Sequence, residues 1–248
     1  MRRQIGLALA LAAAIVGSAQ AALAGAFEVA PTTIELSPRT RTAVVRITNR
    51  GDHAVTIQAR PYDWRQAGGK DILTPSTALA VSPATARLPP GGRQVVRLIE
   101  RESAAGAPEQ AHRLLVRELT SADAVAAGQV RVLLQFSLPV FRPSRIPGAA
   151  SLSWDARVSG DKLILTAANA SPRHAKLANL AVVAAGGGRA EVVPIAYVLP
   201  GSSRSWRVPA GPFERGGDMT LQAEDGVTGR PMTWSLKVRP KDDGRPAR

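Results

Sequence analysis

Short runs in which apolar and polar residues alternate extend from Phe27 almost to the end of the chain. Gly, Pro, Asn or Asp interrupts these runs at intervals of about ten residues, a pattern typical of short strands joined by turns. In residues 42–49, for example, Ala43, Val45 and Ile47 share one face, and Thr42, Arg46 and Thr48 share the other. The sequence therefore predicts an all-β protein with little helix.

Further strands are expected wherever the same alternation returns. After a turn at Asn49–His53 the alternation of core-facing apolar residues with polar ones resumes, and Leu88–Gly92 forms another turn. Residues 103–110 and 122–128 are expected to be loops, the second of them with one helical turn as the alternative. The predicted inward residues are Val55, Ile57, Ala59, Val96, Leu98, Leu114 and Val116.

The first 21 residues have the form of a secretory signal peptide. Arg2 and Arg3 precede the apolar run Ile5–Val16, and Ala19-Gln20-Ala21 is a small-x-small cleavage site. The run is shorter than the roughly 20 residues of a membrane-spanning helix. We therefore predict export with cleavage after Ala21, with Ala24 or Ala26 as alternatives.

The remaining length exceeds one ordinary sandwich and suits two domains of about 100 residues each. Arg142–Gly148 carries two prolines and a glycine where no strand period continues, so the boundary is placed there. The predicted divisions are residues 22–143, residues 144–240 and a flexible tail at 241–248. Strands without βαβ spacing favour two sheets packed face to face, an immunoglobulin-like Greek key in each half.

No catalytic or metal-binding constellation is evident in the sequence. The chain has no cysteine, and His53, His112 and His174 have no partner at the spacing that aims two rings at one metal, so solvated or capping roles are expected. A serine nucleophile motif and a phosphate-binding loop are also missing. The formal charge of +13 is spread along the chain rather than gathered between aromatic residues. We expect no enzymatic activity, cofactor, nucleic-acid partner or stable membrane insertion.

The longest apolar stripe lies near the end of the first predicted domain. It comprises Val130, Val132, Leu134, Phe136, Leu138 and Val140, all on one face. A central strand of the domain's own core would explain the stripe. Alternatively the row serves a partner, because Leu133 faces the other way and Pro139, which lacks an N–H, suits an edge strand.

The order of motifs resembles the periplasmic chaperones of the chaperone/usher pilus pathway over nearly the whole chain after the signal peptide. The segments that carry the likeness are Pro31–Leu36, Val44–Asn49, Leu79–Pro83, Leu88–Leu98, Arg113–Leu119, Leu138–Pro143 and Leu163–Ala170 with Asn169.

This resemblance implies two immunoglobulin-like β-sandwich domains set at an angle, as an L or boomerang. It also implies that the last strand of the first domain lends apolar side chains to a pilus or fimbrial subunit that lacks a strand, and that an outer-membrane usher then receives the subunit. The donor residues would be Val130, Val132, Leu134, Phe136 and Leu138. The protein would act in the periplasm without a nucleotide.

The family also places an Arg and a Lys in the cleft between the domains to bind the carboxyl terminus of the subunit. In this sequence Thr33 and Pro139 stand at those positions. Thr33 could still donate a hydrogen bond, and Arg142 or Arg145 could supply charge, although a solvated position in the linker is the favoured interpretation of both arginines.

The resemblance further implies an ionic cluster that braces the domains, made of Arg97, Glu118 and Glu214, with surface solvation as the alternative. An exported immunoglobulin-like binding module, such as an adhesin or a structural pilus component, is the competing function. Self-association of the unbound protein stays open.

Overall fold

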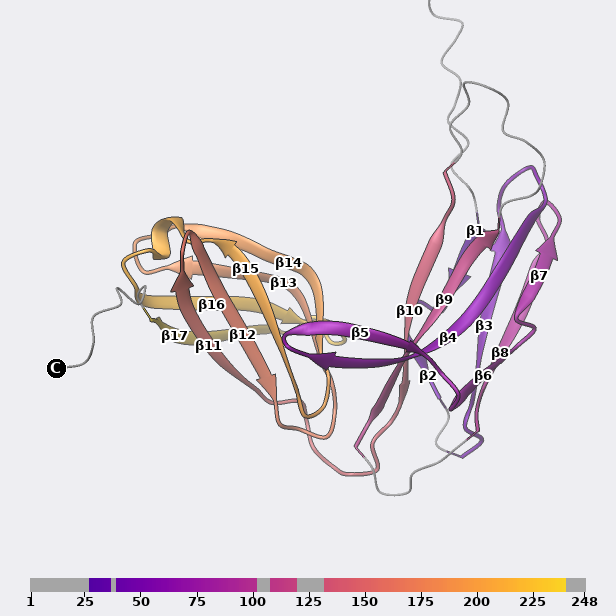
Figure 1. Ribbon diagram of the computed structural model, residues 1–248, viewed down its shortest axis with the longest axis horizontal. Coiled ribbons are helices and arrows are strands. Elements are labelled where there is room, and N and C mark those ends of the chain that lie inside the picture. The colour runs from indigo at the N-terminus through magenta and orange to yellow at the C-terminus, as the bar shows by residue number, and fades with distance from the viewer. Residues whose placement is uncertain (1–26, 37–38, 102–107, 120–131, 240–248) are drawn as a thin grey trace, which may run out of the picture.

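The computed structural model describes residues 27–36, 39–101, 108–119 and 132–239, and it consists of two β-sandwiches inclined to each other (Figure 1). Its regular structure is β-strand apart from one 3-10 turn, η2 (Gly211–Phe213), within the described residues. No helix in this part of the chain has the length and apolar character needed to cross a membrane. The all-β prediction and the two-domain immunoglobulin-like arrangement are confirmed.

The first sandwich packs a four-stranded sheet, ordered β1-β3-β8-β6, against a second sheet, ordered β2-β10-β9-β4-β5, with β7 paired to β4. Its strands are β1 (Phe27–Ala30), β2 (Ile34–Glu35), β3 (Thr42–Asn49), β4 (Val55–Ala67), β5 (Lys70–Pro75), β6 (Leu79–Ser82), β7 (Thr85–Leu88), β8 (Arg93–Glu100), β9 (Gln110–Leu119) and β10 (Gln135–Arg142).

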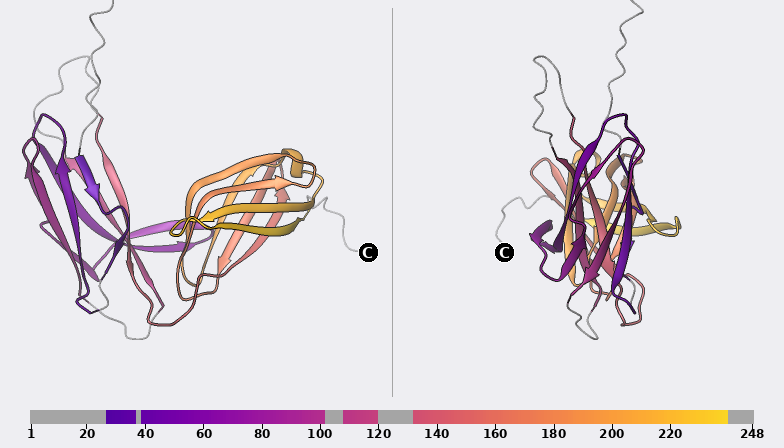
Figure 2. Two further views of the ribbon diagram at one scale, coloured as in Figure 1. Left: turned by 180° about the vertical axis from the view of Figure 1, so that it is seen from behind. Right: turned by 90° about the vertical axis from the view of Figure 1, so that its right-hand side faces the viewer.

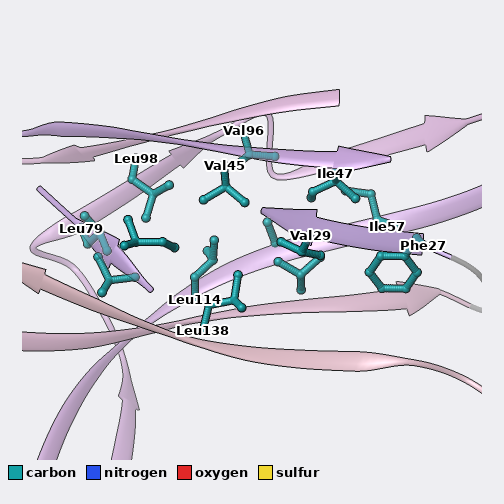
Figure 3. Close-up of a cluster of buried hydrophobic side chains, with 14 of the residues drawn as sticks. Phe27, Val29, Val45, Ile47, Ile57, Leu79, Val96, Leu98, Leu114 and Leu138 are labelled. Atoms are coloured by element: carbon teal, nitrogen blue, oxygen red, sulfur yellow. The ribbon is translucent and has the colours of Figure 1, made fainter. Parts of the chain in front are cut away.

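The core of this sandwich follows the predicted alternation. Val45 and Ile47 of β3 and Val96 and Leu98 of β8 are fully buried between the sheets, as Figure 3 shows. The facing sheet contributes Ile57, Ala59, Leu114 and Val116, and all four are also fully buried. Apolar burial of this kind supplies most of the driving force for folding.

The first strands of the chain contribute to both sheets. β1 pairs antiparallel with β3 in one sheet, and β2 pairs parallel with β10 in the other. Pro31, which has no backbone N–H to place in a ladder, lies between the two strands. This crossing gives β10 a short neighbour at one end.

The second sandwich packs β11-β12-β15 against β14-β13-β16-β17. Its strands are β11 (Leu152–Ser159), β12 (Lys162–Asn169), β13 (Ala175–Ala184), β14 (Arg189–Val198), β15 (Ser202–Pro209), β16 (Gly217–Asp225) and β17 (Pro231–Val238). Every strand expected in this half is present, and the glycine-rich turn at Gly186–Gly188 joins β13 to β14.

The hairpin formed by β4 and β5 was not expected. β4 continues through Pro61 to Ala67, and β5 returns beside it from Lys70. Figures 1 and 2 show this hairpin leaving the first sandwich and reaching the second.

Several predictions fall outside the described residues: the signal peptide at 1–21, the helical turn or loop at 122–128, the tail at 241–248 and the donor residue Val130. The predicted boundary lies in the irregular connection between β10, which ends at Arg142, and β11, which begins at Leu152.

Candidate protein-binding strand and interdomain cleft

β10 is paired along its full length on one side only. It bonds antiparallel to β9, from Gln135 opposite Arg117 to Arg142 opposite Gln110. On the other side β2 reaches only Val140 and Phe141, and no other described strand pairs with β10. The edge of β10 from Gln135 to Pro139 can therefore accept a further strand.

The apolar row of this strand passes from exposed to buried along its length. Val132 is 61% exposed, and Leu133, which faces the other way, is 44% exposed. Leu134 and Phe136 are half-buried against the core of the first sandwich, and the Phe136 ring lies 5.1 Å from that of Phe27. The strand thus extends beyond the end of its own core.

Leu138 requires a correction. It was predicted to face a partner, but it is only 5% exposed and belongs to the core of the first domain. At Leu138 the facing sheet covers the apolar side of β10, because Leu138 packs with residues of both sheets (Figure 3). Val132 and Leu133 are therefore the apolar side chains most available to a partner.

The register brings the two predicted cleft positions together. Ile34 pairs with Val140, so Thr33 precedes the pair at the level of Pro139. Pro139 in turn lies opposite Arg113 on β9. A basic residue thus adjoins Pro139, with Thr33 one strand further away, and sequence reasoning missed it because only the β9–β10 register reveals it.

Arg113 is a partly desolvated cation that faces the second domain. Its guanidinium lies 3.7 Å from the centre of the Trp64 ring and 5.5 Å from that of Tyr197, and it donates a hydrogen bond of 3.2 Å to the Ser137 carbonyl. Burial lowers the pKa of Arg113, and the negative charge of Asp71 opposes this shift. No salt bridge to Arg113 is formed by the described residues, so the group suits a carboxylate brought by a partner.

The predicted ionic cluster is not formed. Arg97 is exposed on β8, whereas Glu118 is buried on β9, in the other sheet. Glu214 is exposed beside η2, at the end of the second sandwich away from the first (Figure 1).

Another buried ion pair lies at the end of the first domain. Arg142 Nε lies 2.8 Å from Glu100 Oε1, with side chains 9% and 1% exposed. Arg142 is therefore a buried structural residue and not a solvated linker arginine, whereas Arg145 is exposed.

Of the three histidines, His112 is buried and His174 is half-buried. His112 Nδ1 lies 3.0 Å from Asp63 Oδ1, and desolvation lowers the pKa of His112 although Asp63 opposes it. His174, in the second domain, bonds through Nδ1 to Glu109 of the first (2.6 Å) and stacks on Phe141. His53 is exposed, as predicted. No group of three or more His, Asp or Glu side chains in the described ranges could hold a metal ion.

A cleft of about 600 Å³ lies between the two domains. Its walls include Asp63, Gln66 and His112 from the first domain and Leu199 and Ser202 from the second. Its lining in the first domain comes mainly from β4 and β9, and β10 contributes none of the lining residues.

Residues 26–147 match the family model for pili and flagellar-assembly chaperones, PapD N-terminal domain. The first domain therefore belongs to this family, and the resemblance seen in the sequence is confirmed. No curated protein matches the sequence.

Solved structures share the fold of both domains. The chain is similar to the CsuC–CsuE chaperone–tip adhesion subunit pre-assembly complex from the archaic chaperone-usher Csu pili of Acinetobacter baumannii, with 19% identity, a TM-score of 0.66, and 88% of this chain and 100% of that chain covered. It also resembles the Salmonella enterica SafA pilin in complex with the SafB chaperone (15% identity, TM-score 0.62, 87% and 99% covered). The Escherichia coli chaperone DraB is similar as well (17% identity, TM-score 0.57, 87% of this chain and 97% of that chain covered).

Proposed function

We propose that this protein is a periplasmic chaperone that captures a pilus or fimbrial subunit by donor-strand complementation and passes it to an outer-membrane usher. Residues 1–21 would direct export as a signal peptide and then be removed by cleavage. The observation that carries the proposal is the one-sided pairing of β10 between Gln135 and Pro139, next to the exposed Val132 and Leu133. The named complexes of similar fold, a chaperone with a tip subunit and a chaperone with a pilin, support it.

The chemistry required is main-chain pairing and apolar burial. A subunit strand laid along β10 would satisfy free backbone groups and give direction to the complex. Burial of an aliphatic side chain contributes about 1.5–3 kcal/mol before ordering costs are subtracted. Val132 would thus supply about 1 kcal/mol, and Leu134 and Phe136, on the same face, could add to this only by leaving part of their own core.

Arg113 completes the proposed site as the residue that receives an anionic group of the subunit. Thr33 and Pro139 replace the basic pair of the family, and the register places Arg113 opposite Pro139. Its partial desolvation strengthens an interaction with a carboxylate relative to one at a fully exposed arginine.

Co-expression with a pilin-like subunit tests the function. Wild type should keep the subunit soluble in the periplasm and Val132→Asp should not, because a charge would enter the apolar groove of the subunit. Leu133→Asp, whose side chain faces the other way, should impair capture less. Thr48→Asp, on the outer face of β3, is the matched control. If all three variants hold the subunit as wild type does, β10 is not the donor strand.

A further inference from the structure

We propose that the tip of the β4–β5 hairpin, residues 66–71, is a clamp that fixes the angle between the domains, with Gln66, Gly69 and Asp71 as positioning residues. The clamp would hold the interdomain cleft in the shape that a subunit fits. The use of the cleft rests on the proposed function, whereas the fixing of the angle does not.

Backbone contact is the first component of the clamp. Gly69 forms an isolated β-bridge with Arg204 of β15, and Ser205 N donates to the Gly69 carbonyl at 3.3 Å. Figures 1 and 2 show the hairpin tip beside the second sandwich from opposite sides. The first domain thus extends a short strand-like contact to a sheet of the second.

Gln66 provides a second link through its side-chain amide. Its Nε2 donates to the Tyr197 carbonyl, and its Oε1 accepts from Leu199 N, both at 2.9 Å. The side chain satisfies one acceptor and one donor of the second-domain backbone, as a neighbouring strand would. Gln66 is 8% exposed, so water competes weakly for these bonds.

Asp71 joins the hairpin to the same surface. Its Oδ1 accepts from Trp64 Nε1 at 3.0 Å and from Gln66 Nε2 at 2.9 Å, and its Oδ2 accepts from Arg204 at 2.6 Å. One carboxylate therefore orients two side chains of the hairpin and pairs with an arginine of the other domain.

An apolar cluster beneath these polar contacts spans both domains. Trp64 and Phe141 from the first domain pack with Tyr197 and Leu199 from the second, and all four are buried. The Trp64 and Tyr197 rings meet edge to face at 5.4 Å. Close-packed side chains of this kind favour one arrangement over a range of angles.

The apolar cluster continues into a further contact between the domains. His174 stacks on Phe141 at 3.8 Å and bonds to Glu109, and Glu109 N donates to the Pro172 carbonyl at 3.0 Å. The interdomain contact therefore extends from the hairpin tip through the cluster to Glu109, and an extended contact opposes rotation of one domain against the other. The irregular connection between β10 and β11 is then not required to set the angle.

Adjacent glycines allow a matched experiment. A Cβ at Gly69 would lie 2.9 Å from Ser205 Oγ and 3.3 Å from Ser205 N, whereas a Cβ at Gly68 would meet nothing within 4 Å. Both residues have a positive φ, +75° and +58°, so alanine strains the turn in both cases. Only Gly69→Ala should also push the hairpin away from the second domain.

The angle between the domains would be measured on the free full-length protein by residual dipolar couplings and small-angle X-ray scattering. We expect a changed orientation in Gly69→Ala and the wild-type orientation in Gly68→Ala. Gln66→Ala, which removes two interdomain hydrogen bonds, should resemble Gly69→Ala, and Gln58→Ala on the exposed part of β4 is its control. Wild-type orientation in both Gly69→Ala and Gln66→Ala would overturn the clamp.

Subunit capture, measured in parallel, tests the consequence. If a tenth of the molecules keep the competent angle, apparent affinity falls about tenfold. A changed angle with unchanged capture would overturn the role of the clamp in shaping the cleft and leave the proposed function standing. Failure of wild type to capture the subunit would refute the proposed function, and the orientation measurements would still decide whether the clamp fixes the angle.

Discussion

Leu138 and Val132 lie on the same face of one chain segment, and truncating each to alanine should have opposite consequences. Leu138 is 5% exposed within the first-domain core, so Leu138→Ala should cost about 2–5 kcal/mol of stability. Val132 is 61% exposed, so Val132→Ala should change stability by no more than about 0.5 kcal/mol.

Subunit affinity should respond mainly at the exposed position. The exposed part of Val132 is worth about 1 kcal/mol on burial, so its loss should weaken binding about fivefold. Calorimetric unfolding gives the stabilities, and competition with tagged wild-type protein for co-expressed subunit gives the affinities. A Val132→Ala variant as unstable as Leu138→Ala, or one that binds as wild type does, would refute this division of the strand.

Two further predictions concern charged groups. Arg113→Gln should weaken subunit binding about tenfold or more, because a hydrogen bond to a charged group contributes about 1.5–3 kcal/mol. The control is Arg117→Gln, since Arg117 lies on the same face of β9 and bonds to Gln58. Equal losses of binding in the two variants would contradict the role assigned to Arg113. Burial lowers the pKa of His112 from its ordinary value of 6.5, so the folded protein holds this imidazole neutral while the unfolded chain takes up a proton. The resulting stabilisation is complete at neutral pH and declines as pH falls below about 6.5. His112→Gln should reduce the fall in Tm between pH 7.5 and 5.5, and an unchanged pH dependence would show that other groups cause it.

The strands could be predicted because each sandwich buries one face of each sheet. In β3 and β8 the apolar residues of the alternating sequence pattern are the buried ones, and the polar residues between them are mostly exposed. The β4–β5 hairpin could not be read in this way. Trp64 and Gln66 in its distal half are buried against the second domain and not against a facing sheet, so no single apolar face marks it.

The charged residues were the least predictable part of the site. Arg142 stands in what resembles a linker, but it is buried beside Glu100, which is distant in sequence. His112 stands at what resembles a strand start, but it is buried beside the distant Asp63. The donor strand itself could be located, because its apolar period is long, but the point where its side chains leave the core depends on how far the facing sheet extends. Leu138 was misassigned for that reason.

Hydrogen exchange of the backbone amides at residues 132–138 tests the central claim most directly. We predict that exchange in this segment slows when the subunit is bound, while amides of β3 and β8, already paired on both sides in their own sheet, change little. Unchanged exchange at residues 132–138 in a stable complex, with new protection elsewhere, would contradict the account.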